Sequence, residues 1–280
     1  MKKIVKTFSI TILLALPAGM IHGQVQTMLI DFGTNAGVPN SPDGNGNHWN
    51  SGITGTDSVQ LQDTAGNNNV ATATLSGTFR TSDNEEGWTD RSEVPSWASG
   101  SVSEALDDRL FQGNNQSGTL TLSGLNTALT YDIELAAAFQ APAGNAGEDP
   151  GFVSLTAGGG LNPVTPVNAR ANPNDNSDLI FNSTQNAYEW TVRTGGDTEL
   201  QGGGSSGADL SPNNEGWIGW YGISPDSNGD ISITFSAIGG ESRGAWNAMS
   251  ITAIPEPSTY AALFGLGALG MILLRRKLRK

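Results

Sequence analysis

Alternation of apolar and polar residues, with a period of two, dominates the middle of the chain and predicts β-strands. The clearest case is residues 129–137, where Leu129, Tyr131, Ile133 and Leu135 alternate with polar neighbours. Such a strand buries one face and exposes the other, as in an antiparallel sheet. Similar patterns predict further strands at residues 25–32, 70–80, 119–123, 152–157, 187–193, 217–223, 231–235 and 245–252.

The segments between these strands predict turns, one long loop and one helix. The Asn-Gly pair at residues 228–229 suits a type I′ turn, so the two flanking strands are expected to form a hairpin. Residues 34–69 are rich in Gly, Asn, Asp, Ser and Pro and are expected to be mostly loop. Residues 103–112 are the one predicted helix, with Ser103 as its N-cap.

These elements predict an all-β fold: a single antiparallel β-sandwich or jelly roll that spans residues 24–253. The order of the segments at residues 29–33, 120–125 and 246–251 resembles that of galactose-binding-like sandwiches, among them malectin-type carbohydrate modules. The resemblance is one of strand order, and it transfers no ligand-binding residue to this chain. It implies a carbohydrate-binding module.

Residues 1–23 have the three-part layout of a secretory signal peptide. Lys2, Lys3 and Lys6 precede an apolar stretch at residues 10–16, and small residues follow Pro17. Cleavage is expected after Gly23. A retained N-terminal anchor is the alternative, although the apolar stretch is short for a membrane span.

Residues 254–280 form a second terminal segment with three parts. A proline-rich hinge comes first, made of Pro255, Glu256, Pro257, Ser258 and Thr259. The uncharged run at 260–274 would be about 22 Å long as a helix and is the predicted transmembrane helix. The basic end, residues 275–280, begins with Arg275, Arg276 and Lys277, which stop the membrane segment on the cytoplasmic side.

The Pro-Glu-Pro motif, the Gly/Ala/Leu run and the Arg-rich end together resemble the PEP-CTERM sorting domain of exported envelope proteins. The resemblance implies a membrane-anchored precursor, an exosortase-type protease as a processing partner, and a final location in the envelope or outside the cell. An ordinary C-terminal anchor with a proline-rich hinge is the alternative. Either interpretation concerns where the protein goes and leaves the role of the body open.

Charge excludes one class of partner. Eight of the 14 Lys and Arg residues lie in the two terminal segments, so six Arg and no Lys face 26 acidic residues between residues 24 and 253. This excess repels phosphates and anionic lipid, and it argues against nucleic-acid binding. It also offers oxygen ligands to a structural calcium ion, the one cofactor considered. The candidate ligands are on Asp- and Asn-rich loops, at Asp43, Asp175, Asp178, Asp226 and Asp230; turn formation alone is the alternative.

The seven tryptophans and the acidic pairs carry the remaining hypotheses. Trp49, Trp88 and Trp97 occur in polar segments, where each either caps the core or stacks on a sugar ring of a polysaccharide. No catalytic residue is assigned, because no histidine or cysteine motif for nucleophilic catalysis is present. The leading prediction is therefore a non-catalytic envelope protein. The alternatives are a glycan hydrolase that uses a carboxylate pair and a purely structural surface or biofilm component.

Overall fold

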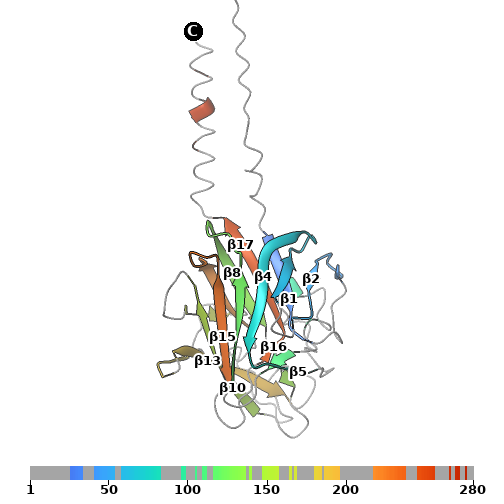
Figure 1. Cartoon of the computed structure of the whole chain (residues 1–280), viewed down its shortest axis with the longest axis vertical. Coiled ribbons are helices and arrows are strands. Elements are labelled where there is room, and N and C mark those ends of the chain that lie inside the picture. Colours follow the sequence, from blue (N-terminus) through green and yellow to red (C-terminus); the bar gives the residue numbers. More distant parts are fainter. Residues whose placement is uncertain are drawn as a thin grey trace, which may run out of the picture.

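The structure, a computed structural model, describes the β-rich body and a few residues beyond it (Figure 1). The described residues are 26–33, 41–53, 58–82, 96–98, 105, 109–111, 116–136, 139–140, 147–157, 164–165, 167–168, 180–184, 186–195, 217–237, 245–255, 265, 269–271 and 275. The predicted signal peptide, residues 1–23, lies outside them.

Strands account for most of the described residues. They are β1 (Gln26–Asp31), β2 (Trp49–Asn50), β3 (Ser58–Gln62), β4 (Asn68–Gly77), β5 (Arg80–Ser82), β6 (Arg109–Phe111), β7 (Ser117–Ser123), β8 (Leu129–Ala136), β9 (Phe139–Gln140), β10 (Gly147–Thr156), β11 (Val167–Asn168), β12 (Ile180–Asn182), β13 (Ala187–Gly195), β14 (Trp217–Ile223), β15 (Ile231–Ala237), β16 (Ala245–Trp246) and β17 (Ala248–Pro255). The prediction of an all-β fold is confirmed at this level.

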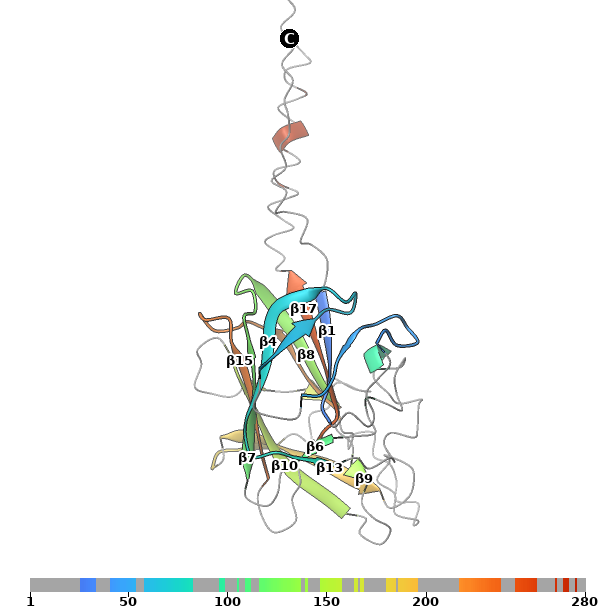
Figure 2. The same ribbon diagram turned by 45° about the vertical axis from the view of Figure 1, so that its right-hand side comes forward.

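Within the described residues, the strands form two large sheets and a small one. The first sheet has the order β11-β14-β8-β17-β1-β2, and the second has the order β12-β13-β10-β15-β7-β4-β3, with β9 beside β13. The small sheet is β16-β6-β5. All pairs are antiparallel except β1 with β2 and β13 with β9. In the rotated view, β4, β7 and β15 lie on one side of the body, and β1, β8 and β17 lie on the other (Figure 2).

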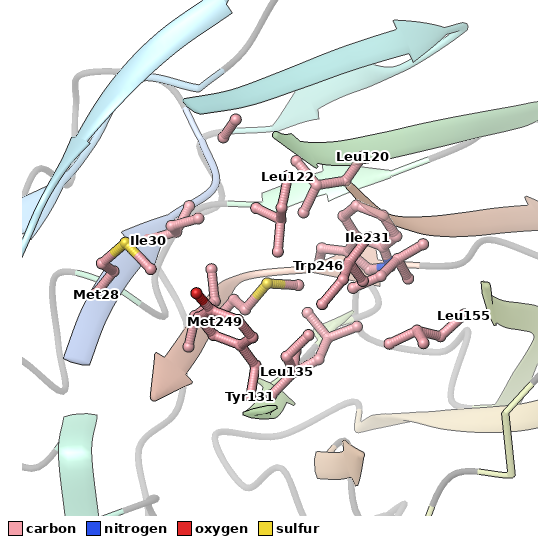
Figure 3. Packing of buried hydrophobic residues seen from close by; sticks show 14 of the residues in the cluster. Met28, Ile30, Leu120, Leu122, Tyr131, Leu135, Leu155, Ile231, Trp246 and Met249 are labelled. Atoms are coloured by element: carbon pink, nitrogen blue, oxygen red, sulfur yellow. The ribbon is translucent and has the colours of Figure 1, made fainter. Parts of the chain in front are cut away.

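One hydrophobic core joins the inner faces of the two large sheets. The predicted alternation places Tyr131 and Ile133 of β8 in this core, and Ile231 and Ile233 of β15 reach it from the second sheet. Figure 3 shows Leu120, Leu122 and Ile231 of the second sheet near Trp246, with Leu135 and Met249 of the first sheet nearby. Burial of each such side chain contributes about 1.5–3 kcal/mol, so this shared core holds the two sheets together.

The predicted hairpin of residues 217–223 and 231–235 is wrong. β14 pairs with β8 in the first sheet, whereas β15 pairs with β7 and β10 in the second, so the connection crosses between sheets. Among these residues Gly229 has a positive φ of 83°, but Asn228 does not, and a type I′ turn requires both. Each strand has its own apolar face, and alternation alone does not say which sheet that face completes.

A second connection between the two large sheets lies against the one that joins β14 to β15. β7 belongs to the second sheet and β8 to the first, and residues 124–128 connect them. The two crossings are hydrogen-bonded to each other, since the Leu125 amide donates to the Gly229 carbonyl at 3.0 Å. A Cβ at Gly229 would lie 2.5 Å from the Leu125 carbonyl oxygen, so only glycine fits there.

Two further predictions need correction. Residues 34–69, expected to be mostly loop, contain β2, β3 and the start of β4. Of the predicted helix at 103–112, the structure describes Ala105 as helical but residues 109–111 as β6, where Leu110 pairs with Trp246. Leu110 is buried against the core, and that contact outweighs the local helical preference.

The start of β1 and the end of β17 lie side by side. Gln26 pairs with Ala253, and the register continues to Asp31 and Ala248. β17 is therefore an interior strand of the first sheet, with β8 on one side and β1 on the other (Figure 1). Both ends of the folded body reach the same edge of the molecule.

Candidate functional site

Three loops share one five-residue pattern, in which an aspartate is followed by glycine at the fourth position and Asn or Asp at the fifth. They begin at Asp43, Asp63 and Asp226. In each loop one carboxylate oxygen accepts the backbone amides of the third and fifth residues, at 2.8–3.0 Å. The carbonyl of the same aspartate accepts the amide of the glycine. Turn chemistry therefore accounts for all three loops.

These hydrogen bonds also set the acidity of the three aspartates. Burial alone would raise the pKa of the Asp43 carboxyl, but donation from the Trp49 indole and the Asn47 and Asn45 amides outweighs burial and lowers that pKa. For Asp63, burial again acts to raise the pKa, but hydrogen bonds from Asn67, Gln26 and Ala65 outweigh it and lower the pKa below its usual value. The backbone amides of Asp230 and Asn228 lower the pKa of Asp226. The three side chains are therefore carboxylates at neutral pH.

The calcium hypothesis gains no further ligands from this geometry. Asp43 and Asp226 already accept amides from their own loops, and Asp230 supplies one of those amides. Across the described residues, no group of three His, Cys, Asp or Glu side chains is arranged to hold a metal ion. Asp175 and Asp178 lie outside the described part of the chain. Calcium binding stays a prediction.

Asp63, which the sequence interpretation did not single out, offers a direct test of the loop pattern. Its side chain is only 7% exposed and also accepts a hydrogen bond from Gln26 Nε2 at 3.3 Å. We expect Asp63→Ala to lower the free energy of unfolding at pH 7 by about 2 kcal/mol, because the Ala65 and Asn67 amides lose a charged acceptor. Urea denaturation measures this loss.

Asp63→Asn is the matched control, because it keeps an acceptor oxygen and removes only the charge. Since the folded-state pKa of Asp63 is lowered, its charge stabilises the fold above the unfolded pKa of about 4 and stops doing so as pH falls through the folded value. The stability difference between wild type and Asp63→Asn should therefore shrink as the pH falls below about 4. A difference that grows toward acid would contradict this assignment.

The three loop tryptophans have different positions. Trp49 belongs to β2, is 5% exposed, and donates from Nε1 to Asp43 Oδ2 at 3.0 Å. Its predicted loop position is wrong, and its buried indole is not free to stack on a sugar. Trp97 lies in a single 3-10 turn, Ser96–Ala98, is partly exposed, and packs on Trp49 with ring centroids 6.2 Å apart. Trp88 lies outside the described residues.

Trp97 also meets a carboxylate on the outer face of the first sheet. Glu134 of β8 points away from the core, because Ile133 and Leu135 on either side of it are buried. Its Oε2 accepts from Trp97 Nε1 at 2.6 Å, and its Oε1 accepts from the Tyr221 hydroxyl at 2.8 Å. We call these three residues the Glu134 cluster.

Local backbone geometry places Tyr221 in this cluster. Gly219 faces Glu134 in the β14–β8 register, and a Cβ there would lie 2.9 Å from the Tyr221 hydroxyl, so the ring lies over the glycine. The register shifts between Trp220 and Ile223, which brings the Gly222 amide to Asp132 Oδ1 at 2.8 Å. Burial, the hydrogen bond to Glu134 and the charges of Glu134 and Asp132 all raise the pKa of Tyr221, so its hydroxyl stays a donor.

The sequence indicates only part of this cluster. Alternation along β8 predicts that Asp132 and Glu134 point outward, and this is confirmed by the burial of their neighbours. The partners come from β14 and from the turn at Ser96–Ala98, and no local pattern links those segments to β8. A glycine two residues before an exposed tyrosine in a strand is the one signal that could have indicated Tyr221.

The C-terminal segment begins inside the fold. β17 continues to Pro255, which pairs with Leu129 of β8, so the first proline of the predicted hinge belongs to the sheet. Beyond it, the described residues are Gly265, 269–271 and Arg275, all helical. Within that described part, we find no helix with the length and apolar character that crossing a bilayer requires. Glu256, Pro257, Ser258, Thr259, Arg276 and Lys277 lie outside the described residues.

A family model for the PEP-CTERM protein-sorting motif matches residues 253–277. The chain carries a PEP-CTERM sorting motif. This confirms the resemblance inferred from the Pro-Glu-Pro hinge and the basic end. The PEP-CTERM motif indicates an exported surface protein that is anchored at its C-terminus before processing by an exosortase, a membrane protein.

Comparison with curated proteins finds no match to this PEP-CTERM chain. The malectin-type resemblance of the body therefore stays a prediction. The motif accounts for about a tenth of the sequence and for its destination.

Proposed function

We propose that this chain is an exported envelope or matrix protein whose β-sandwich binds an extracellular polysaccharide and does not cleave it. The supporting observation is the Glu134 cluster, in which a carboxylate holds two aromatic side chains on the outer face of the first sheet. The proposal includes a signal peptide at residues 1–23 and a membrane helix at 260–274, and it includes no cofactor.

The chemistry of the Glu134 cluster suits a sugar. Tyr221 is 44% exposed, and Trp97 is partly exposed, so each offers an aromatic surface to the C–H face of a pyranose ring. Each Glu134 oxygen has a second lone pair that can accept from a sugar hydroxyl. Asp132, two residues along the same strand, adds another acceptor.

Charge narrows the class of polysaccharide. The body between residues 24 and 253 carries 26 acidic residues against six Arg, so an anionic polymer is repelled. A neutral glycan meets no such barrier, and its hydroxyls can donate to Glu134 and Asp132. We therefore propose a neutral polysaccharide as the ligand.

Removing the aromatic side chains tests the proposal. Affinity electrophoresis across a panel of glucans, mannans and galactans first identifies a neutral polysaccharide that retains the wild-type protein. We expect the double variant Trp97→Ala/Tyr221→Ala to bind this polysaccharide at least tenfold more weakly. Gly219→Ala should weaken binding less, because it only displaces the Tyr221 ring. Thr234→Val, on the second sheet, is the matched control and should bind like wild type.

The outcomes separate this proposal from its alternatives. Retention that is unchanged in the double variant removes the Glu134 cluster as the site. Absence of retention on every glycan favours a purely structural surface component. A glycan hydrolase is a second candidate, because Asp132 and Glu134 are two carboxylates on the outward face of β8, and glycoside hydrolysis requires a pair of positioned carboxyl groups. If the wild-type protein releases soluble sugar fragments from a glycan and Glu134→Gln abolishes this activity, the hydrolase candidate is supported.

A further inference from the structure

The sorting motif and the folded body overlap. The motif match begins at Ala253, whereas β17 ends at Pro255, so Ala253, Ile254 and Pro255 belong to both. A processing protease therefore meets a segment whose first three residues are already part of a sheet.

These three residues are held by different sets of contacts. Ala253 is paired on both sides, with Gln26 of β1 and Tyr131 of β8, and is 5% exposed. Ile254 pairs with Thr130, whose hydroxyl donates to the Ile254 carbonyl at 3.4 Å. Pro255 pairs with Leu129 and has no N–H to donate, so the ladder ends there without an unpaired amide.

Lifting this segment from the fold would disturb the core. β17 lies between β8 and β1, and its inward residues Met249, Ile251 and Ala253 belong to the core cluster. Proteases cut backbone that is accessible, and cutting inside a packed strand depends on the small population in which that strand has opened. Bonds upstream of Pro255 are therefore poor substrates while the body is folded.

The strand ends that lie beside the end of β17 are also held by hydrogen bonds. Gln26, opposite Ala253, donates to Asp63 of one hydrogen-bonded loop. The crossing that leads into Leu129 is tied to the Asp226 loop through Leu125 and Gly229. The sorting motif thus begins within an interior strand of the sheet, and no linker separates the body from the start of the motif.

We propose that the folded sheet sets the upstream limit of processing, so that the exosortase cuts C-terminal to Pro255 and the mature protein keeps all of β17. This inference rests on exosortase processing, which the sorting motif indicates. One backbone amide C–N bond breaks: the oxygen of a water molecule adds to the acyl carbon to give the new C-terminal carboxyl group, and the hydrogen goes to the nitrogen of the released tail, which becomes its new N-terminal amine. The fold, and not only the motif, then fixes the end of the mature chain.

Protection by the fold is tested on the full chain in detergent, without any exosortase. The chain is digested with proteinase K, and the C-terminus of the protected body is read by mass spectrometry. We expect that end at or after Pro255. Trimming of the folded wild-type body to Ile254 or earlier would overturn the proposal.

Substitutions of Ala253 in the same digestion test whether the packing of β17 provides the protection. Ala253→Asp places a carboxylate in the core and should move the protected end upstream of residue 253, whereas the matched control Ala253→Ser should keep the wild-type end. An unchanged end in a folded Ala253→Asp protein would show that β17 gives no protection and would overturn the proposal.

Processing itself is read in the native host. The C-terminal peptide of the mature protein should retain Pro255, and a mature end at or before Ile254 overturns the inference while leaving exosortase processing intact. A chain that keeps Lys280 in the host overturns processing, and with it the assignment of a cut after Pro255; the digestion result then reports on the protection of β17 alone.

Discussion

Replacing Trp246 by alanine should destabilise the protein more than any other single substitution considered for this chain, by about 3–5 kcal/mol. Trp246 of β16 is 1% exposed, and its ring meets Phe32, Phe79 and Phe235 with centroids 5.4–5.9 Å apart. The substitution leaves a large cavity at the place where the small sheet joins the two large ones. Since domains are typically stable by about 5–15 kcal/mol, urea denaturation should show a much lower midpoint.

Trp246→Phe is the matched control for this expectation. The Trp246 Nε1–H is buried and has no acceptor among the residues that the structure describes. Phenylalanine removes that unpaired donor and keeps most of the aromatic contact, so we expect a loss of about 1–2 kcal/mol. A loss for Trp246→Phe as large as that for Trp246→Ala would contradict the packing explanation and indicate that the indole N–H has a partner.

The sequence predicts individual strands well, because each buried face is a local pattern. Ala71, Ala73 and Leu75 alternate along β4, and all three are buried as expected. The partners of each strand are not local. The Asn228–Gly229 pair is typical of a hairpin, yet β14 and β15 join different sheets. The Asp63 loop makes the same hydrogen bonds as the Asp226 loop and connects the paired strands β3 and β4, so the turn alone does not decide which sheet the next strand joins.

The same contrast between local patterns and non-local contacts applies to the candidate site. The sorting motif is contiguous, so it can be recognised from the sequence alone. The Glu134 cluster combines residues from three separate segments, and only the folded sheet brings Trp97 and Tyr221 to Glu134. For Trp49 the sequence left capping of the core and stacking on a sugar both open, and its burial favours capping, because Asp43 accepts from the indole N–H.

Replacing Pro255, Glu256 and Pro257 together by alanine should abolish sorting while leaving the body folded. Only Pro255 of the three lies in β17, at its last position, where alanine is tolerated because it adds a donor at a strand end. We expect at least a tenfold decrease in processed protein outside the cell and accumulation of a chain that keeps Lys280. Cell fractionation with intact-mass measurement distinguishes the two forms.

Thr130→Val provides the matched control, because it removes the hydrogen bond to the Ile254 carbonyl beside the motif without altering the motif. This variant should be processed and located like wild type. If the triple-alanine chain is shortened and exported as efficiently as the Thr130→Val chain, the Pro-Glu-Pro residues do not direct sorting. If both variants fail equally, sorting instead depends on the contacts at the end of β17, because these contacts are what both variants alter. The pair therefore separates recognition of the motif from the fold that presents it.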